Sequence, residues 1–190
     1  VQTCALPIYQ GVDELILKHF GMETKIVESG WSEYLDRYLN PRKVVRIGLT
    51  GKYLGPRDTY ASIHHAIEHA TTALGVEAEV VDIPTDRVET EEIDVAAELS
   101  HVSGIIVPGG FGRRGAEGKI SCIRYAREND LPYLGLCYGF QMAAIEYART
   151  VCGMEGAHTT EIVPDTPYPV ICLLPEQYEI EGIGGNMRLG

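Results

Sequence analysis

The chain has 190 residues, 45% of them hydrophobic, which is enough to bury the core of one α/β domain. Its formal net charge of -11 disfavours nucleic-acid binding, and no apolar run reaches the length of a membrane span, so we expect neither partner. Five cysteines without a CxxC pair indicate neither a disulfide framework nor a zinc site, and they predict a cytoplasmic protein.

The first part of the chain is expected to lie outside the main domain. Residues 1–8 fit none of the patterns in the rest of the chain, and we interpret them as a non-native scar. Helical spacing of apolar residues predicts a short helix over 11–20, and we interpret residues 9–21 as the tail of an upstream domain. Residues 22–42 mix charged residues with one helical patch, which predicts an interdomain linker.

From residue 43 onward, apolar strand runs alternate with helical stretches. This alternation predicts a doubly wound, mostly parallel sheet with flanking helices, and residues 43–190 would form a partial domain that is truncated at both ends. Strands are predicted over 44–49, 77–83, 104–107, the run ending at Cys137, and 170–174; helices are predicted over 58–74, 90–101, 116–129 and 139–151. Asp58 would cap its helix, and the His65 and His69 pair lacks a third metal ligand, so we expect no metal site.

Two loops that come after predicted strands carry the candidate chemistry. Residues Pro108–Gly115, the glycine-rich loop, can direct backbone N–H groups into a nest for an anion or oxyanion. Arg113 and Arg114 in this loop would either meet a phosphate or be solvated. Residues Gly135–Gly139, the cysteine turn, join a strand to a helix and place Cys137 on a nucleophile elbow. In a parallel sheet the two loops would emerge at the same edge.

The cysteine turn favours a reactive thiol. Its glycines permit a strained turn, and the N-terminal amides of the following helix favour the thiolate, which is the nucleophilic form. A buried core cysteine is the alternative, and we expect it for Cys122, Cys152 and Cys172, which have no such turn.

Several stretches together resemble the glutaminase half of the CTP synthase family, and the resemblance covers nearly the whole chain after residue 8. They are Pro108–Lys119, Tyr125–Gln141 and Gly184–Gly190, with support from Gly51–Tyr53 and Asp58–Ser62. The resemblance implies a class I glutamine amidotransferase fused to an amidoligase, whose synthetase half would end within residues 9–21.

The family hydrolyses L-glutamine and passes ammonia to a second site, where UTP activated by ATP and Mg²⁺ becomes CTP. The resemblance therefore implies a ligase of pyrimidine biosynthesis, with GTP as an allosteric activator and a homotetramer as the assembly. ATP and Mg²⁺ would serve the full-length enzyme, and no cofactor is expected within these residues.

The resemblance also implies roles for particular residues. Cys137 would attack the side-chain amide carbon of glutamine, the backbone N–H groups of Gly110 and Tyr138 would hold the oxyanion, and Glu161 would meet the α-ammonium. Without the resemblance, Glu161 would be interpreted as an exposed loop carboxylate. The positions implied to bind the substrate are Gly110, Tyr138, Gly139, Phe140, Gln141 and Glu161.

The chain also departs from the family. Tyr138, Phe140 and Asn186 stand where Leu, Met and Thr are usual, and Tyr138 is expected to reshape the pocket while its backbone donor survives. The family takes its general base from a His-x-Glu, a pattern that is absent from this sequence and that the resemblance places beyond residue 190. His158 is a poor substitute, so we expect the isolated chain to have little or no glutaminase activity.

Two alternatives stay open at this point. Another class I cysteine hydrolase, such as a γ-glutamyl hydrolase or a different amidotransferase, would share the cysteine turn but not all the stretches together. A non-catalytic module that binds a nucleotide or a partner would keep the cysteine as a relic, and it would not react with an electrophilic glutamine analogue.

Overall fold

The computed structural model describes residues 10–22, 30–52, 54 and 59–173. The chain forms two compact units, which comprise residues 1–45 with 60–79 and residues 46–59 with 80–190. The predictions for residues 1–8, for the cap Asp58 and for the stretch 184–190 lie outside the described residues.

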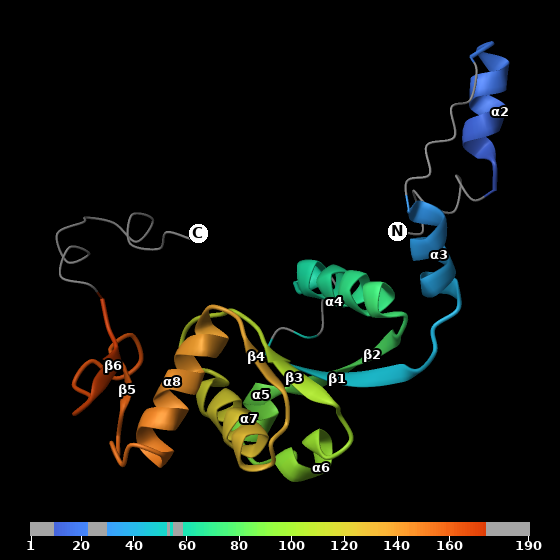
Figure 1. Ribbon diagram of the computed structural model, residues 1–190. Coiled ribbons are helices and arrows are strands. Elements are labelled where there is room, and N and C mark those ends of the chain that lie inside the picture. The colour runs from blue at the N-terminus through green and yellow to red at the C-terminus, as the bar shows by residue number, and fades with distance from the viewer. Residues whose placement is uncertain (1–9, 23–29, 53, 55–58, 174–190) are drawn as a thin grey trace. The chain divides into compact units, whose positions relative to one another are not determined.

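The described part of the first unit carries three helices, α2 (Val12–His19), α3 (Trp31–Leu39) and α4 (Ala61–Leu74) (Figure 1). All three were predicted. α3 packs against α4, and its buried residue is Leu35. α4 ends at Gly75, whose φ of 65° is a left-handed conformation that glycine adopts without steric cost.

A four-stranded sheet has the order β2-β1-β3-β4. Its strands are β1 (Val44–Gly51), β2 (Glu77–Pro84), β3 (Gly104–Val107) and β4 (Tyr133–Gly135). β3 pairs in parallel with both β1 and β4. Because the strand order reverses between β1 and β3, their carboxyl ends open the crevice where doubly wound sheets bind ligands. The predicted doubly wound, parallel α/β fold is confirmed.

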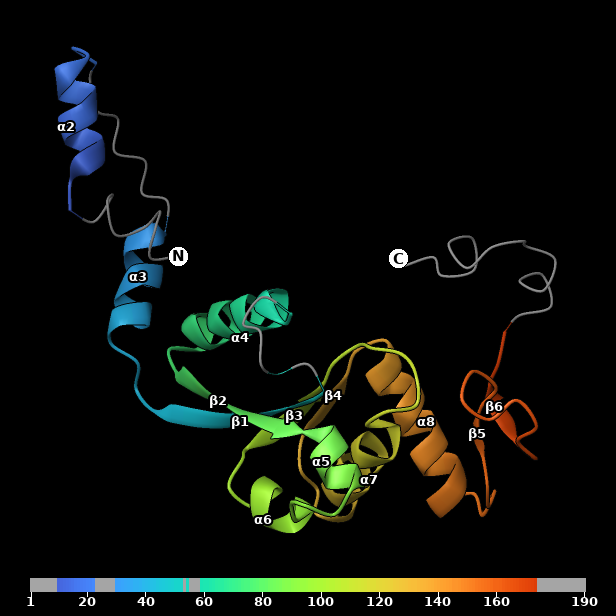
Figure 2. The ribbon, with the colours of Figure 1, turned by 180° about the vertical axis from the view of Figure 1, so that it is seen from behind.

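Helices of the second unit cover one face of this sheet. α7 (Ala116–Glu128) and α8 (Tyr138–Thr150) pack against each other and against β3 and β4 (Figures 1 and 2). The short helices α5 (Thr85–Glu89) and α6 (Val95–Leu99) pack on α7. The apolar core beneath them includes Ile83, Leu99, Val107, Met142 and Ile145.

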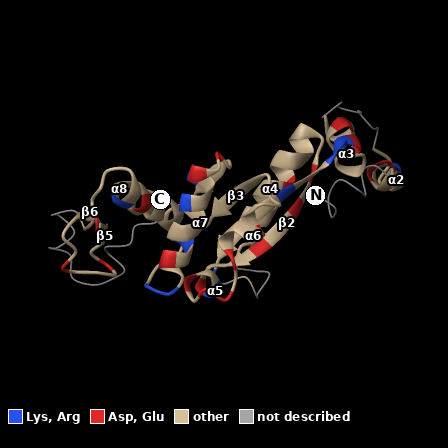
Figure 3. Ribbon diagram, turned by 90° about the horizontal axis from the view of Figure 1, so that it is seen from below, with Lys and Arg blue, Asp and Glu red and all other residues tan. Residues whose placement is uncertain are grey.

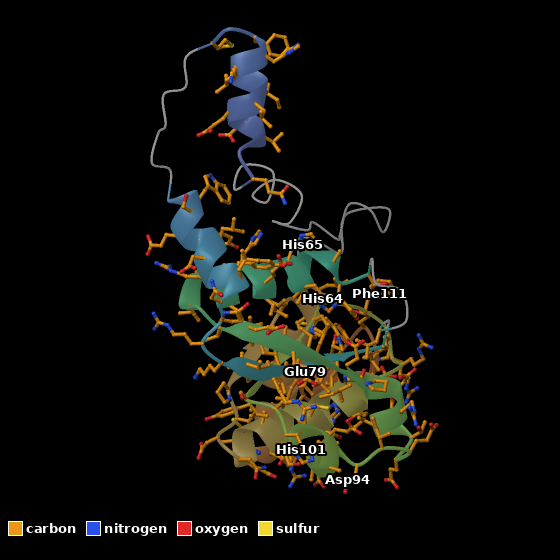
Figure 4. All side chains as sticks on the ribbon, turned by 90° about the vertical axis from the view of Figure 1, so that its right-hand side faces the viewer. His64, His65, Glu79, Asp94, His101 and Phe111 are labelled. Atoms are coloured by element: carbon orange, nitrogen blue, oxygen red, sulfur yellow. The ribbon has the colours of Figure 1, made fainter. Side chains whose placement is uncertain are left out.

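The single helix predicted over 90–101 is wrong. Thr90 ends α5, which the sequence did not predict, and Glu91 then takes a left-handed φ of 59° that no helix continues through. Asp94, which is labelled in Figure 4, caps α6 instead. Its carboxylate accepts the Ala96 N–H at 2.7 Å. The acidic residues predicted to occupy a first helical turn therefore form a turn and a cap.

The chain beyond α8 forms a separate two-stranded parallel sheet of β5 (His158–Thr159) and β6 (Pro169–Ile171). The strand predicted over 170–174 is thus shorter and begins one residue earlier, and its last residue lies outside the described part. Among the described helices, none combines the length and apolar character that crossing a membrane requires.

Candidate active site

Cys137 lies at the N-cap of α8 with φ 51° and ψ -107°, a conformation that costs a non-glycine residue roughly 1–3 kcal/mol. The glycines beside it are required by close approach. A Cβ on Gly139 would overlap the Val107 carbonyl, and one on Gly135 would overlap the Tyr133 hydroxyl. The turn leaves Cys137 exposed, so the strand-to-helix turn predicted from the sequence presents this side chain at the sheet edge.

The glycine-rich loop runs directly beside the cysteine turn. A Cβ built on Gly109 would lie 3.6 Å from the Cβ of Cys137, and one on Gly110 would lie 3.9 Å from Cδ1 of Tyr138. The parallel pairing of β3 with β4 brings the two loops to one edge. Tyr138 is the first residue of α8, so its N–H has no acceptor within the helix. The structure therefore places the two predicted oxyanion donors on neighbouring segments.

Both peptide groups of Gly112 are held by predicted site residues. The Tyr138 hydroxyl donates to the Gly112 carbonyl at 2.8 Å, and the Gly112 N–H donates to the Glu161 carboxylate at 2.9 Å. Burial raises the pKa of Tyr138, and the carboxylates of Glu161, Glu117 and Glu89 raise it further. The phenol therefore stays protonated as a donor, and exposed Glu161 reaches the glycine-rich loop.

The remaining predicted substrate positions lie on the first turn of α8. Phe140 is 65% exposed, and Gln141 is partly buried. Gly139 is buried; its N–H donates to the Leu136 carbonyl at 2.9 Å, and its carbonyl accepts the Tyr133 hydroxyl at 2.7 Å. Both peptide groups of Gly139 are therefore used inside the turn.

Lys119 is a site-adjacent residue that the sequence did not predict. Its side chain is 2% exposed, and Nζ donates to the Pro108 carbonyl at 2.9 Å and lies 5.2 Å from the Tyr138 ring centroid. Burial lowers the pKa of Lys119 to about 8, the Lys52 charge also lowers this pKa, and Cys137 opposes the shift. A lysine in the first turn of the helix after a glycine-rich loop is the signal that points to it.

His158 belongs to an ion-pair cluster. Its Nδ1 accepts the Thr159 N–H at 2.8 Å, and its Nε2 lies 3.3 Å from an oxygen of Glu117, a carboxylate that also pairs with Arg149. Burial and then the Arg149 charge lower the pKa of His158, with Glu117 opposing, so the ring is neutral at pH 7. Because both ring nitrogens are engaged, His158 has no free nitrogen with which to act as the base for Cys137.

The outer part of the glycine-rich loop is charged and solvent-facing. Arg113 and Arg114 line a surface hollow with residues of α5, and an Arg114 nitrogen lies 3.9 Å from an Asp86 oxygen. Phe111 is exposed (Figure 4), and Lys52 Nζ donates to its carbonyl and lies 5.7 Å from its ring centroid. Both signs of charge occur along neighbouring α7 (Figure 3). That these arginines meet a phosphate stays a prediction.

The other described cysteines differ from one another. Cys122 is buried as predicted, and burial raises its pKa to about 12. Cys152 and Cys172 are exposed, so the prediction of buried core thiols is wrong for them. They come just after the ends of α8 and β6, where the chain leaves the core. The described histidines, cysteines and acidic residues form no group of three that could hold a metal.

An exposed cysteine on a strained turn beside a glycine-rich loop, at the edge of a parallel sheet, is the arrangement expected of a cysteine-dependent hydrolase on an α/β fold. The sequence model of the family described as "Glutamine amidotransferase class-I" matches residues 56–190. The chain belongs to this family.

Individual similar proteins show which members of this family the chain resembles. The chain is 46% identical over 186 residues to the CTP synthase of Methanocaldococcus jannaschii and 49% identical over 185 residues to that of Desulfitobacterium hafniense. Each alignment covers 95% of this chain and 34% of the relative, so the chain spans about a third of their length. The glutaminase domain of Trypanosoma brucei CTPS, solved with bound acivicin, is 34% identical with a TM-score of 0.65, covering 70% of this chain and 51% of that one. The resemblance to the CTP synthases is confirmed.

Proposed function

We propose that the chain is the glutamine-hydrolysing part of a CTP synthase. The observation that carries the proposal is the strained, exposed Cys137 at the start of α8, with Gly109 and Gly110 beside it. Such a turn keeps the sulfur clear of its own backbone and close to helix amides. The similarity to CTP synthases supports glutamine as the substrate rather than another amide.

The first chemical step would be the attack of the Cys137 thiolate on the side-chain amide carbon of glutamine. A carbon–sulfur bond forms, and the amide oxygen becomes an oxyanion. The backbone N–H groups of Gly110 and Tyr138 would donate to it. These amides gain most from the interaction in the transition state, so they lower the barrier rather than tighten ground-state binding.

The intermediate then collapses. The carbon–nitrogen bond breaks, the nitrogen leaves with a proton as ammonia, and a γ-glutamyl thioester remains on Cys137. Water attacks the thioester, glutamate leaves, and the thiol is restored. These proton transfers need a general base. The resemblance assigns it to a His-x-Glu pair, which this sequence lacks, and both nitrogens of His158 are engaged elsewhere.

Glu161 would bind the α-ammonium of glutamine. Its exposed carboxylate already accepts the Gly112 N–H at 2.9 Å and has lone pairs left for a charge-assisted hydrogen bond. The substrate would therefore join two segments that are far apart in sequence, the glycine-rich loop and the segment after β5. Phe140 and Gln141 at the start of α8 would line the same pocket.

The ammonia would aminate UTP to CTP in the synthetase part of the whole protein. ATP, Mg²⁺ and GTP would act there, and the whole protein would assemble as a homotetramer in the cytoplasm. The steps proposed for this chain concern its own side chains and backbone.

Labelling with acivicin, the compound bound to the similar glutaminase domain, tests the proposal. We expect covalent labelling of the tryptic peptide 128–149, whose only cysteine is Cys137, and no labelling of this peptide in Cys137→Ala. Cys152→Ala removes another exposed thiol and is the matched control, which should label normally. Equal labelling of Cys137 and Cys152, or none in the folded chain, would favour a non-catalytic binding module.

A further inference from the structure

We propose that Lys119 is a positioning residue of the thiol site: its buried ammonium fixes the Pro108 carbonyl and sets a positive charge beside the oxyanion site and Cys137. This inference rests on the proposed function only in taking Cys137 as the nucleophile. Lys119 lies on α7, which packs against the strands that lead into both loops.

Geometry puts the ammonium directly behind the glycine-rich loop. Nζ donates to the Pro108 carbonyl at 2.9 Å, which fixes the first peptide of the loop. A Cβ built on Gly110 would lie 3.5 Å from Nζ, so the cation touches the segment that carries one proposed oxyanion donor. Gly109, which lies between them, approaches Cys137 closely, because a Cβ built on it would lie 3.6 Å from the cysteine Cβ. The Lys119 side chain therefore contacts the glycine-rich loop at both Pro108 and Gly110.

The Tyr138 ring lies beside the ammonium, with 5.2 Å from Nζ to the ring centroid, and it helps to exclude water from it. In the described part of the chain, three ionisable groups lie near the Lys119 ammonium: Lys52 after β1, Cys137 in the cysteine turn and Tyr138 at the start of α8. Cys137 raises the pKa of Lys119, against the burial that lowers it to about 8. The geometry therefore puts the ammonium where negative charge on the sulfur or on the oxyanion would form.

A purely structural role does not explain this residue. Among the described residues, no carboxylate forms an ion pair with Lys119, and a buried cation without one carries a desolvation cost. An apolar side chain of similar length would fill the space without that cost. A positive charge gains value here only when negative charge forms nearby, as it does on the thiolate and on the oxyanion.

The test compares alkylation of Cys137 by two reagents of nearly equal size, iodoacetate and iodoacetamide. Only the first is an anion, so the ratio of the two rates reports positive charge near the sulfur, whereas a packing change alters both rates together. The rates are read on peptide 128–149 in the wild-type chain, in Lys119→Met and in Arg124→Met. Arg124→Met removes an exposed cation from the same helix and is the matched control.

We expect Lys119→Met to lower the ratio about threefold or more at pH 7 and to slow both reactions, while Arg124→Met leaves both rates unchanged. If Lys119→Met does not fold, the wild-type chain decides the question, because its ratio should fall between pH 7 and about pH 9.5 as Lys119 loses its proton. A ratio that is independent of the substitution, or constant with pH in the wild type, would overturn the proposal. Neither measurement involves glutamine hydrolysis, so acivicin labelling can fail while this test succeeds, and the reverse.

Discussion

Two buried charges in the second unit are handled in opposite ways. Glu146 on α8 is 2% exposed and receives the guanidinium of Arg127 at 2.9 to 3.2 Å, together with the Thr150 hydroxyl. Lys119 on α7 is equally buried, yet a backbone carbonyl is its hydrogen-bond acceptor. The partners of the Glu146 carboxylate lie on α7 and α8, whereas the Lys119 ammonium lies against the glycine-rich loop. The ion pair of Glu146 joins α7 to α8, and the Lys119 charge is held at the proposed thiol site without a carboxylate partner among the described residues.

The largest expected effect is the pH dependence that Lys119 gives to stability. Burial lowers its pKa from 10.5 to about 8, so between these values the unfolded chain binds more protons at this residue than the folded chain. The folded state therefore gains about 3 kcal/mol as pH rises through this window, and it gains nothing from this residue below it. Urea denaturation measures the unfolding free energy of the wild type and of Lys119→Met at both ends of this pH window. The value for the wild type minus the value for Lys119→Met should increase by about 3 kcal/mol from pH 8 to pH 10.5.

Arg124→Met is the control for that experiment, since its cation is exposed and pairs with Glu128. Its unfolding free energy should differ from the wild-type value by the same small amount at both ends of the window. A difference between Lys119→Met and wild type that does not change with pH would mean that Lys119 is as well solvated when folded as when unfolded.

Removal of the paired charge, Glu146, should have a smaller effect, and this effect is a loss of stability at pH 7 and not a pH dependence. Glu146→Ala eliminates the ion pair with Arg127 and opens a cavity in the α7–α8 interface, so we expect a loss of roughly 2 kcal/mol. The residual Arg127 is a third exposed and can be rehydrated, which limits the loss. Urea denaturation at pH 7 measures it, and the iodoacetate-to-iodoacetamide ratio at Cys137 should stay unchanged.

Glu128→Ala is the matched variant, because Glu128 also contacts Arg127 but is exposed. It should cost far less stability than Glu146→Ala. Equal losses would show that burial adds nothing to the value of this ion pair, and a changed ratio in Glu146→Ala would show that the two charges are not independent.

The sequence was informative where local backbone demands decide the structure. The cysteine turn could be predicted because a strand run, two glycines and a helical stretch leave few conformations for Cys137, and the structure has the expected strained turn. The meeting of this turn with the glycine-rich loop resulted from parallel pairing of consecutive strands.

Prediction failed where packing overrides local pattern. The residues near Glu91 carry charges suited to a first helical turn, yet the chain reverses there so that α5 and α6 can both pack on α7. The burial of Lys119 depends on how α7 packs beside the glycine-rich loop. The spacing of apolar residues in the sequence does not predict this packing. Cys152 and Cys172 have apolar or helical neighbours in the sequence but come just after elements end, where the path of the next segment decides whether a side chain is covered.

The smallest change is expected for Tyr138→Phe, which tests the hydrogen bond that holds the glycine-rich loop independently of the Lys119 charge. Tyr138→Phe removes the hydroxyl that donates to the Gly112 carbonyl at 2.8 Å and keeps the ring beside Lys119. We expect a loss of about 1 kcal/mol of unfolding free energy. Acivicin labelling of Cys137 should slow several-fold, because Gly112 also holds Glu161. The alkylation ratio should not change, since the ammonium stays in place.

Tyr133→Phe is the control, because its hydroxyl donates to the Gly139 carbonyl at 2.7 Å, in the cysteine turn and not in the glycine-rich loop. It should cost similar stability without loosening the glycine-rich loop, and denaturation and labelling measured on both variants test this. If Tyr138→Phe instead lowers the alkylation ratio as Lys119→Met does, the phenol and the ammonium act as one unit. The charge of Lys119 and the hydrogen bond of Tyr138 to the loop would then not be separate contributions, because Tyr138 would hold Lys119 in place.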